Sequence, residues 1–172
     1  MDGNASGKLR SIISTRAVQI IVISLVSLFL AQFIKFVIIS IKEKKLDWKL
    51  LVSTGGFPSS HCALVVTLCV TLGMFQYHDL DGNLDWSFAV ALIISVIIIH
   101  DAMGVRLEAS KHAKILNNLA ADMSDEEKKE LGYGKKGRLK EMLGHKGIEV
   151  LGGIIFGAII GLIGFWIFVE II

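Results

Sequence analysis

Two histidines of this 172-residue chain are candidates for acid–base or nucleophilic chemistry. The first, His61, follows the only proline and two serines in the run Pro58-Ser59-Ser60-His61. Proline favours the first helical turn and serine favours the N-cap, so a helix is predicted to begin here. The backbone N–H groups and the positive end of that helix would accept a phosphate group. An ordinary N-cap beside a chance histidine is the alternative interpretation.

The second candidate, His145, precedes Glu149 by four residues. Positions i and i+4 share one face of a helix, so the carboxylate could orient the imidazole and stabilise its positive charge. The other ring nitrogen would then act as a nucleophile or a base. A surface histidine beside a boundary glutamate is the simpler alternative for an isolated pair.

Several basic residues could complete an anion site around these histidines. Lys35 lies inside a long apolar stretch, where a charge suggests function by default, although a lysine near a helix end can extend to the surface. Lys42 follows two turns later on the same helix face, about 10 Å away. Asp101 and Arg106 could form a structural ion pair or contact a substrate, and Lys111 lies just beyond them.

Apolar stretches supply the elements that must position these residues. Hydrophobic residues make up 53% of the chain and charged residues 20%, and the charges crowd between four apolar stretches. Residues 17–41 would span about 37 Å as a helix, which exceeds the roughly 30 Å of a bilayer core. A signal peptide is excluded because this stretch is long and no small-residue cleavage site follows it.

The second and third apolar stretches are short for membrane spans. They become long enough only if one helix begins at Ser59–Ser60 and the other extends through His100–Gly104. We therefore predict an all-α fold, a polytopic membrane helical bundle with about four transmembrane helices over residues 17–41, 61–77, 86–99 and 148–169.

The chain is predicted to form a single integral-membrane domain over residues 1–172. Residues 1–16 are a polar N-terminal segment, and residues 101–147 form a long polar loop that contributes to the site. Within this loop, residues 105–123 have the pattern of an amphipathic helix. Ser124 to Glu127 match a capping box, which would start a short helix that ends at Gly132.

Four spans place His61 and His145 on the same side of the membrane. That side carries 14 Lys and Arg residues, whereas the other side carries Lys8, Arg10 and Arg16. The positive-inside rule then puts the site on the cytoplasmic face, and we expect an integral protein of a bacterial plasma membrane. The net charge of +2 is too small to indicate a nucleic-acid partner. No metal site is predicted, because Asp101 and Glu108 do not make a two-carboxylate cluster.

Glycines recur every fourth residue in the last apolar stretch, at Gly153, Gly157 and Gly161. Small residues at this spacing form a smooth stripe that lets two helix backbones approach closely in lipid. The stripe would pack against another helix of the same chain and bring His145 toward His61, or it would form the seam of a homodimer.

As a set, these motifs resemble the divergent branch of the type 2 phosphatidic acid phosphatase family, also described as acid phosphatase/vanadium-dependent haloperoxidase-related membrane proteins. The resemblance covers about residues 31–164 and is strongest at residues 55–61, 101–106 and 143–151. The wider family has three motifs: a Lys with an Arg seven residues on and then a Pro, Pro-Ser-Gly-His, and an Arg followed by His and Asp. Here Lys42 replaces the first arginine, Glu43 the proline after it, Ser60 the glycine, Glu149 the aspartate and Leu139 the last arginine.

The resemblance implies a metal-independent lipid phosphate phosphatase that needs no cofactor and works in two steps. His145 would attack phosphorus to give a phosphohistidine, Glu149 would hold its ring, and His61 would protonate the leaving oxygen. The phosphoryl oxygens would be held by Lys35, Lys42, Ser59, Ser60 and a basic residue of the long loop, which is Arg106, Lys111, Arg138 or Lys140, with Asp101 beside them.

The substrate implied by a site at the membrane boundary is a phospholipid or a polyprenyl (di)phosphate. Non-catalytic binding or transport of an anionic lipid through the same basic pocket is the competing function. A transferase of activated phospholipid head groups would need several metal-binding aspartates near Asp101, and the sequence has none there.

Overall fold

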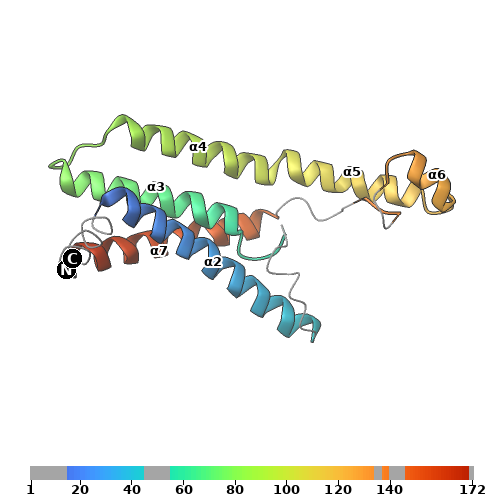
Figure 1. The fold of residues 1–172 in the computed structure, drawn as a ribbon, viewed down its shortest axis with the longest axis horizontal. Helices are drawn as coiled ribbons and strands as arrows, with labels where there is room; N and C mark the ends of the chain where they lie inside the picture. The colour runs from blue at the N-terminus through green and yellow to red at the C-terminus, as the bar shows by residue number, and fades with distance from the viewer. Residues whose placement is uncertain (1–14, 45–54, 134–136, 140–145, 171–172) are drawn as a thin grey trace, which may run out of the picture.

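The computed structural model describes residues 15–44, 55–133, 137–139 and 146–170. Over these residues the chain forms helices and no strand, as Figure 1 shows. Four segments are long and apolar enough to cross a membrane: α2, α3, α4 continued by α5, and α7. The expected all-α bundle with four transmembrane helices is confirmed. The helices are α2 (Arg16–Glu43), α3 (Ser60–Asp79), α4 (Trp86–Met103), α5 (Val105–Leu119), α6 (Asp125–Glu130) and α7 (Gly147–Glu170).

The second and third apolar stretches form helices that extend beyond the apolar residues, as a membrane span requires. Helix α3 begins at Ser60 with Ser59 as its N-cap, and α4 continues to Met103. The hydroxyl of Ser59 accepts a hydrogen bond from the backbone N–H of Cys62 at 3.4 Å. Pro58 lies one residue before this N-cap, outside the first helical turn where the sequence had suggested it.

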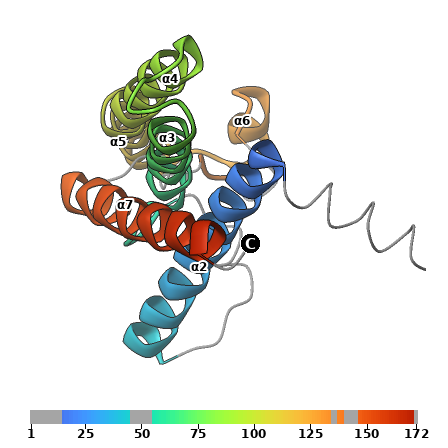
Figure 2. The same ribbon diagram turned by 90° about the vertical axis from the view of Figure 1, so that its left-hand side faces the viewer.

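Helix α3 is the centre of the bundle and packs against α2, α4 and α7 (Figures 1 and 2). The glycine stripe of α7 faces α3 of the same chain. A Cβ atom at Gly153 would lie 2.5 Å from the carbonyl oxygen of Ser59, and one at Gly157 would lie 2.5 Å from that of Ala63. The stripe therefore makes a close intramolecular contact, and a homodimer through the same glycines would have to displace α3.

A buried hydroxyl near the middle of α3 joins three helices. Thr67 is 0% exposed and donates to the carbonyl oxygen of Gly157 on α7 at 2.8 Å. Its oxygen also lies 2.7 Å from Oγ of Ser27 on α2. Polar groups inside a bilayer need partners within the protein, so these contacts fix α2, α3 and α7 relative to one another.

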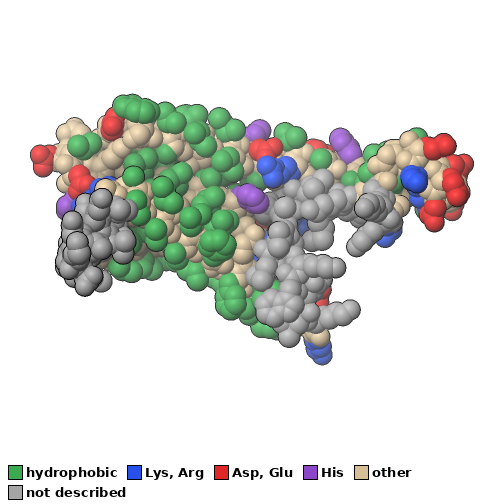
Figure 3. All heavy atoms as spheres, in the orientation of Figure 1, with side chains coloured by type: hydrophobic (Ala, Val, Ile, Leu, Met, Phe, Trp, Pro, Cys, Tyr) green, Lys and Arg blue, Asp and Glu red, His purple; other side chains and the backbone are tan. Residues whose placement is uncertain are grey.

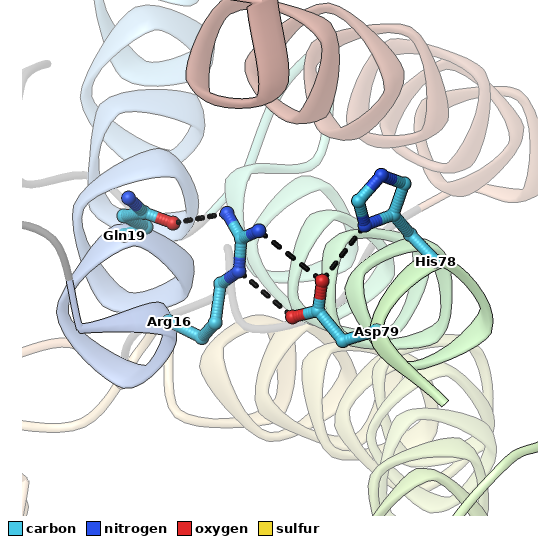
Figure 4. Close-up of polar contacts among 4 residues, drawn as sticks. All are labelled: Arg16, Gln19, His78 and Asp79. Atoms are coloured by element: carbon cyan, nitrogen blue, oxygen red, sulfur yellow. Dashed lines mark hydrogen bonds and ion pairs between the residues drawn. The ribbon is translucent and has the colours of Figure 1, made fainter. Parts of the chain in front are cut away.

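An ion pair ties α2 to α3 at the end of the bundle opposite His61 (Figure 4). Nε of Arg16 lies 2.8 Å from Oδ2 of Asp79, and the Arg16 guanidinium lies 4.5 Å from the centre of the Phe75 ring. Gln19 accepts from Arg16, and His78 contacts Asp79 at 2.8 Å. Arg16 is one of the three basic residues expected on the side of the membrane opposite His61, and its charge is thus balanced by that of Asp79.

The long loop carries a helical arm that projects from the bundle (Figure 1). Helix α5 continues α4 beyond Gly104 and ends at Leu119, four residues before the expected end. The predicted capping box is confirmed: Ser124 caps α6, and both its hydroxyl and its N–H contact Glu127. These hydrogen bonds lower the pKa of Glu127. Gly132, at φ +78°, follows the end of α6.

Candidate functional site

The loop of residues 55–59 lies between α2 and α7 at the start of α3. Gly56 has φ +107°, a conformation that side chains disfavour, and a Cβ atom there would lie 3.0 Å from Cδ of Lys35 on α2. The N–H of Ser59 donates to the carbonyl oxygen of Glu149 on α7 at 2.9 Å. The motif that carries His61 is therefore bound to both neighbouring helices.

Lys35 is buried, with 1% of its surface exposed. Its aliphatic stem packs on Gly56, and its charge interacts electrostatically with Glu149. The alternative in which a lysine near a helix end extends to the surface does not apply here. A buried cation beside a carboxylate at one end of a membrane bundle suggests a functional site.

His61 occupies the first turn of α3 and is partly buried. The positive charges of Arg106 and Lys35 both act on its imidazole ring. Ser59 and Ser60, which precede it, are 0% and 2% exposed. Helices α2 and α5 therefore bring Lys35 and Arg106 within electrostatic range of His61 on α3.

Arg106 is held at the start of α5 by an ion pair with Asp101 near the end of α4. Nε of Arg106 lies 2.6 Å from Oδ2 of Asp101, and the two side chains are 49% and 37% exposed. The structural ion pair that the sequence suggested is confirmed. A guanidinium has five N–H donors, so Arg106 can keep this contact and also bind an anion.

Glu149 lies in the first turn of α7, where it has a structural contact of its own. Its Oε2 accepts from the backbone N–H of Lys146 at 3.1 Å, which caps the start of the helix. Its predicted partner His145 lies outside the described residues, as does Lys140. The pairing of His145 with Glu149 therefore stays a prediction.

Three other basic candidates are not brought to His61. Lys42 is exposed in the last turn of α2, where that helix diverges from the bundle (Figures 1 and 2). Lys111 pairs with Glu108 at 2.6 Å, and both side chains are more than half exposed. Figure 3 shows charged side chains along the arm and where the arm meets the hydrophobic belt of the bundle.

Arg138, the third of these candidates, is exposed and lies on the arm. The next residue, Leu139, is bound through both backbone groups by Asn117 of α5, at 2.8 and 3.0 Å. Asn117 is 11 residues beyond Arg106, about 16 Å along the helix. Among the basic candidates of the long loop that the structure describes, Arg106 is the one whose charge acts on His61.

Sequence reasoning missed the roles of Asn117 and Gly56. An asparagine in the middle of a helical pattern gives no signal that it binds a distant backbone. The glycine pair before Pro58 was the signal for Gly56, because the loop approaches Lys35 too closely for a side chain.

The fold and this cluster define a class: polytopic helical membrane proteins with a histidine, a buried lysine and an arginine gathered at one end of the bundle. The sequence matches the family described as the divergent PAP2 family over residues 17–160, and the chain belongs to that family. It is similar to the uncharacterized membrane protein YuiD of Bacillus subtilis (strain 168), with 42% identity over 146 residues, which are 81% of this chain and 89% of that protein. No solved structure matches. The resemblance seen in the motifs is thus confirmed.

Proposed function

We propose that this protein is a membrane phosphatase that hydrolyses a phospholipid or polyprenyl (di)phosphate through a phosphohistidine, without a metal or cofactor. The observation that carries the proposal is the convergence of Lys35, His61 and Arg106 around the loop bound to Glu149. Membership of the divergent PAP2 family supports the same chemistry.

The proposed reaction has two steps. A ring nitrogen of His145 attacks phosphorus, the bond from phosphorus to the leaving oxygen breaks, and His61 donates a proton to that oxygen. Water then attacks phosphorus, the phosphorus–nitrogen bond to His145 breaks, His61 takes a proton from this water, and inorganic phosphate leaves. Lys35, Arg106 and the backbone N–H groups at the start of α3 stabilise the negative charge that develops on the phosphoryl oxygens.

Arg106 takes the place of the arginine that the wider family has at the position of Leu139. Two observations support this assignment: Arg106 acts electrostatically on His61, and Asn117 holds the backbone of Leu139 about 16 Å farther along α5. Asp101 is then a positioning residue, because it fixes the guanidinium through Nε.

A second function, non-catalytic binding or transport of an anionic lipid, uses the same cluster. One observation favours it: Ser59 and Glu149 both make helix-capping hydrogen bonds with the backbone. These hydrogen bonds account for the positions of Ser59 and Glu149 in a binding pocket without giving either residue a catalytic role.

Release of inorganic phosphate by the purified protein tests the proposed function. With a chelator present, the protein is expected to hydrolyse one or more members of a lipid phosphate panel and to be inhibited by vanadate. His145→Ala should abolish turnover, because it removes the nucleophile. His61→Ala should slow turnover by about 10²–10⁴-fold, mainly for substrates with poor leaving groups.

His112→Ala is the matched control for the two histidine variants, because His112 is exposed on the polar arm. Its activity should equal that of the original protein. Full activity in His145→Ala would exclude the phosphohistidine. Binding of a lipid phosphate without any release of phosphate would favour the non-catalytic function.

We further propose that the site faces the cytoplasm of a bacterial cell, because 14 basic residues lie on its side of the membrane. Cys62 and Cys69 are buried, so single exposed cysteines can be labelled in this background. In intact cells, an impermeant thiol reagent should label Asn83→Cys and should label Lys114→Cys only after permeabilisation. The reverse pattern would invert the orientation and leave the composition of the site unchanged.

A further inference from the structure

Phe57 stands out in the loop that carries the candidate site. It is 43% exposed, whereas Pro58, Ser59 and Ser60 directly after it are buried. A large exposed aromatic side chain within an otherwise buried polar motif contributes nothing to the proposed phosphate chemistry, so its position needs another explanation.

The ring of Phe57 is held against α7. Gly152 leaves room for it, because any side chain at that position would overlap the ring carbons Cε2 and Cζ. Gly152 lies three residues after Glu149 on α7. Gly56, which directly precedes Phe57 in the chain, packs on Lys35. The ring is therefore fixed directly beside the residues that would hold the phosphate.

The depth of the ring follows from its neighbours on α7. Leu151 and Ile155, on either side of Gly152 along the helix, are 54% and 53% exposed. In a helix long and apolar enough to cross a membrane, exposed aliphatic side chains at this level face the hydrocarbon of the bilayer. Because its ring packs at the level of Gly152, the exposed part of Phe57 is expected at the border between the bilayer and the site.

We propose that Phe57 forms the bilayer-side wall of the site and contacts the first apolar segment of a lipid phosphate substrate. The inference rests on the proposed function and adds a means of selection, because a phosphate that carries a hydrocarbon chain gains apolar contact area that a small soluble phosphate ester lacks. This contact is the same in the bound substrate and in the transition state, so it lowers KM and leaves kcat unchanged.

Kinetics on two substrates of different length test this inference. For Phe57→Ala, KM for a long-chain lipid phosphate in detergent micelles should rise about tenfold with kcat within twofold. KM for a two-carbon soluble phosphate monoester should stay unchanged. Phe57→Leu should restore most of the lipid affinity, since it returns apolar area without the ring.

Phe33→Ala is the matched control, because Phe33 is a 57% exposed phenylalanine on the outer face of α2. It should leave both KM values unchanged. Gly152→Ala perturbs the same contact from the other side, because its methyl group would displace the Phe57 ring. It should raise KM for the lipid phosphate in the same direction as Phe57→Ala.

Equilibrium binding of the lipid phosphate to the detergent-solubilised protein separates this inference from the proposed function. If the original protein binds the lipid phosphate but releases no phosphate, catalysis is refuted, and a tenfold weaker affinity in Phe57→Ala still supports the wall. Unchanged affinity and KM in Phe57→Ala would overturn the inference whatever the activity. An equal rise in KM for both substrates would also overturn it, since that indicates general distortion of the site.

Discussion

Replacing Lys35 with methionine is expected to lower kcat by about 10²–10³-fold while the protein stays folded. Lys35 is 1% exposed, and its stem packs on Gly56, so an unbranched apolar side chain of similar length fills the same space. Only the charge is lost, and with it the stabilisation of a phosphoryl oxygen in the transition state. Phosphate release by the purified variant measures the effect.

Removing one charge of a buried pair can unfold a protein, so the partner of Lys35 matters. Glu149 is partly exposed and keeps its hydrogen bond from the backbone N–H of Lys146. Its carboxylate is therefore not left buried without a partner, and the thermal midpoint in detergent should change little.

Lys42→Met is the control for this prediction, because Lys42 is exposed seven residues later on the same helix. Its activity should stay within about threefold of the original, as is usual for a surface charge far from the reacting atoms. If Lys42→Met were as inactive as Lys35→Met, then both lysines would hold the substrate as the family motif implies. Full activity in Lys35→Met would exclude Lys35 from the reaction.

Replacing Gly157 with leucine is expected to disrupt the bundle and abolish activity. A Cβ atom at Gly157 would lie 2.5 Å from the carbonyl oxygen of Ala63 and 3.0 Å from its Cα, so α3 and α7 would have to separate. Overpacking a close contact costs about 1–3 kcal/mol, and more where backbone atoms must move. The bond from Thr67 to the carbonyl oxygen of Gly157 would be lost as well.

Thermal unfolding in detergent and the molar mass of the purified protein together measure this effect. Gly147→Ala is the matched control on the same helix, because nothing lies within 4 Å of a Cβ atom there. Lost activity and stability without a change in oligomeric state would agree with the intramolecular contact. A shift from dimer to monomer would instead assign the stripe to a homodimer, and an unchanged variant would refute both alternatives.

The sequence by itself determined the four spans and the N-caps of two helices. Bilayer thickness sets the length of an apolar helix, and capping is decided within a few residues, so both are local properties. Ser59 as the N-cap of α3 and Ser124 as that of α6 were predictable for this reason. Alternation of the spans also placed His61 on the same side as the basic loop without any knowledge of packing.

Only the tertiary structure decided which basic residues meet His61. Lys35, Lys42, Lys111 and Arg106 are all cations that could bind a phosphate, and although the apolar surroundings of Lys35 set it apart, spacing alone does not show which of them lie near His61. Burial against Gly56 selects Lys35, and the ion pair with Asp101 at the junction of α4 and α5 selects Arg106. These contacts join residues far apart in the chain, so they depend on how the helices pack and not on the pattern within any one of them.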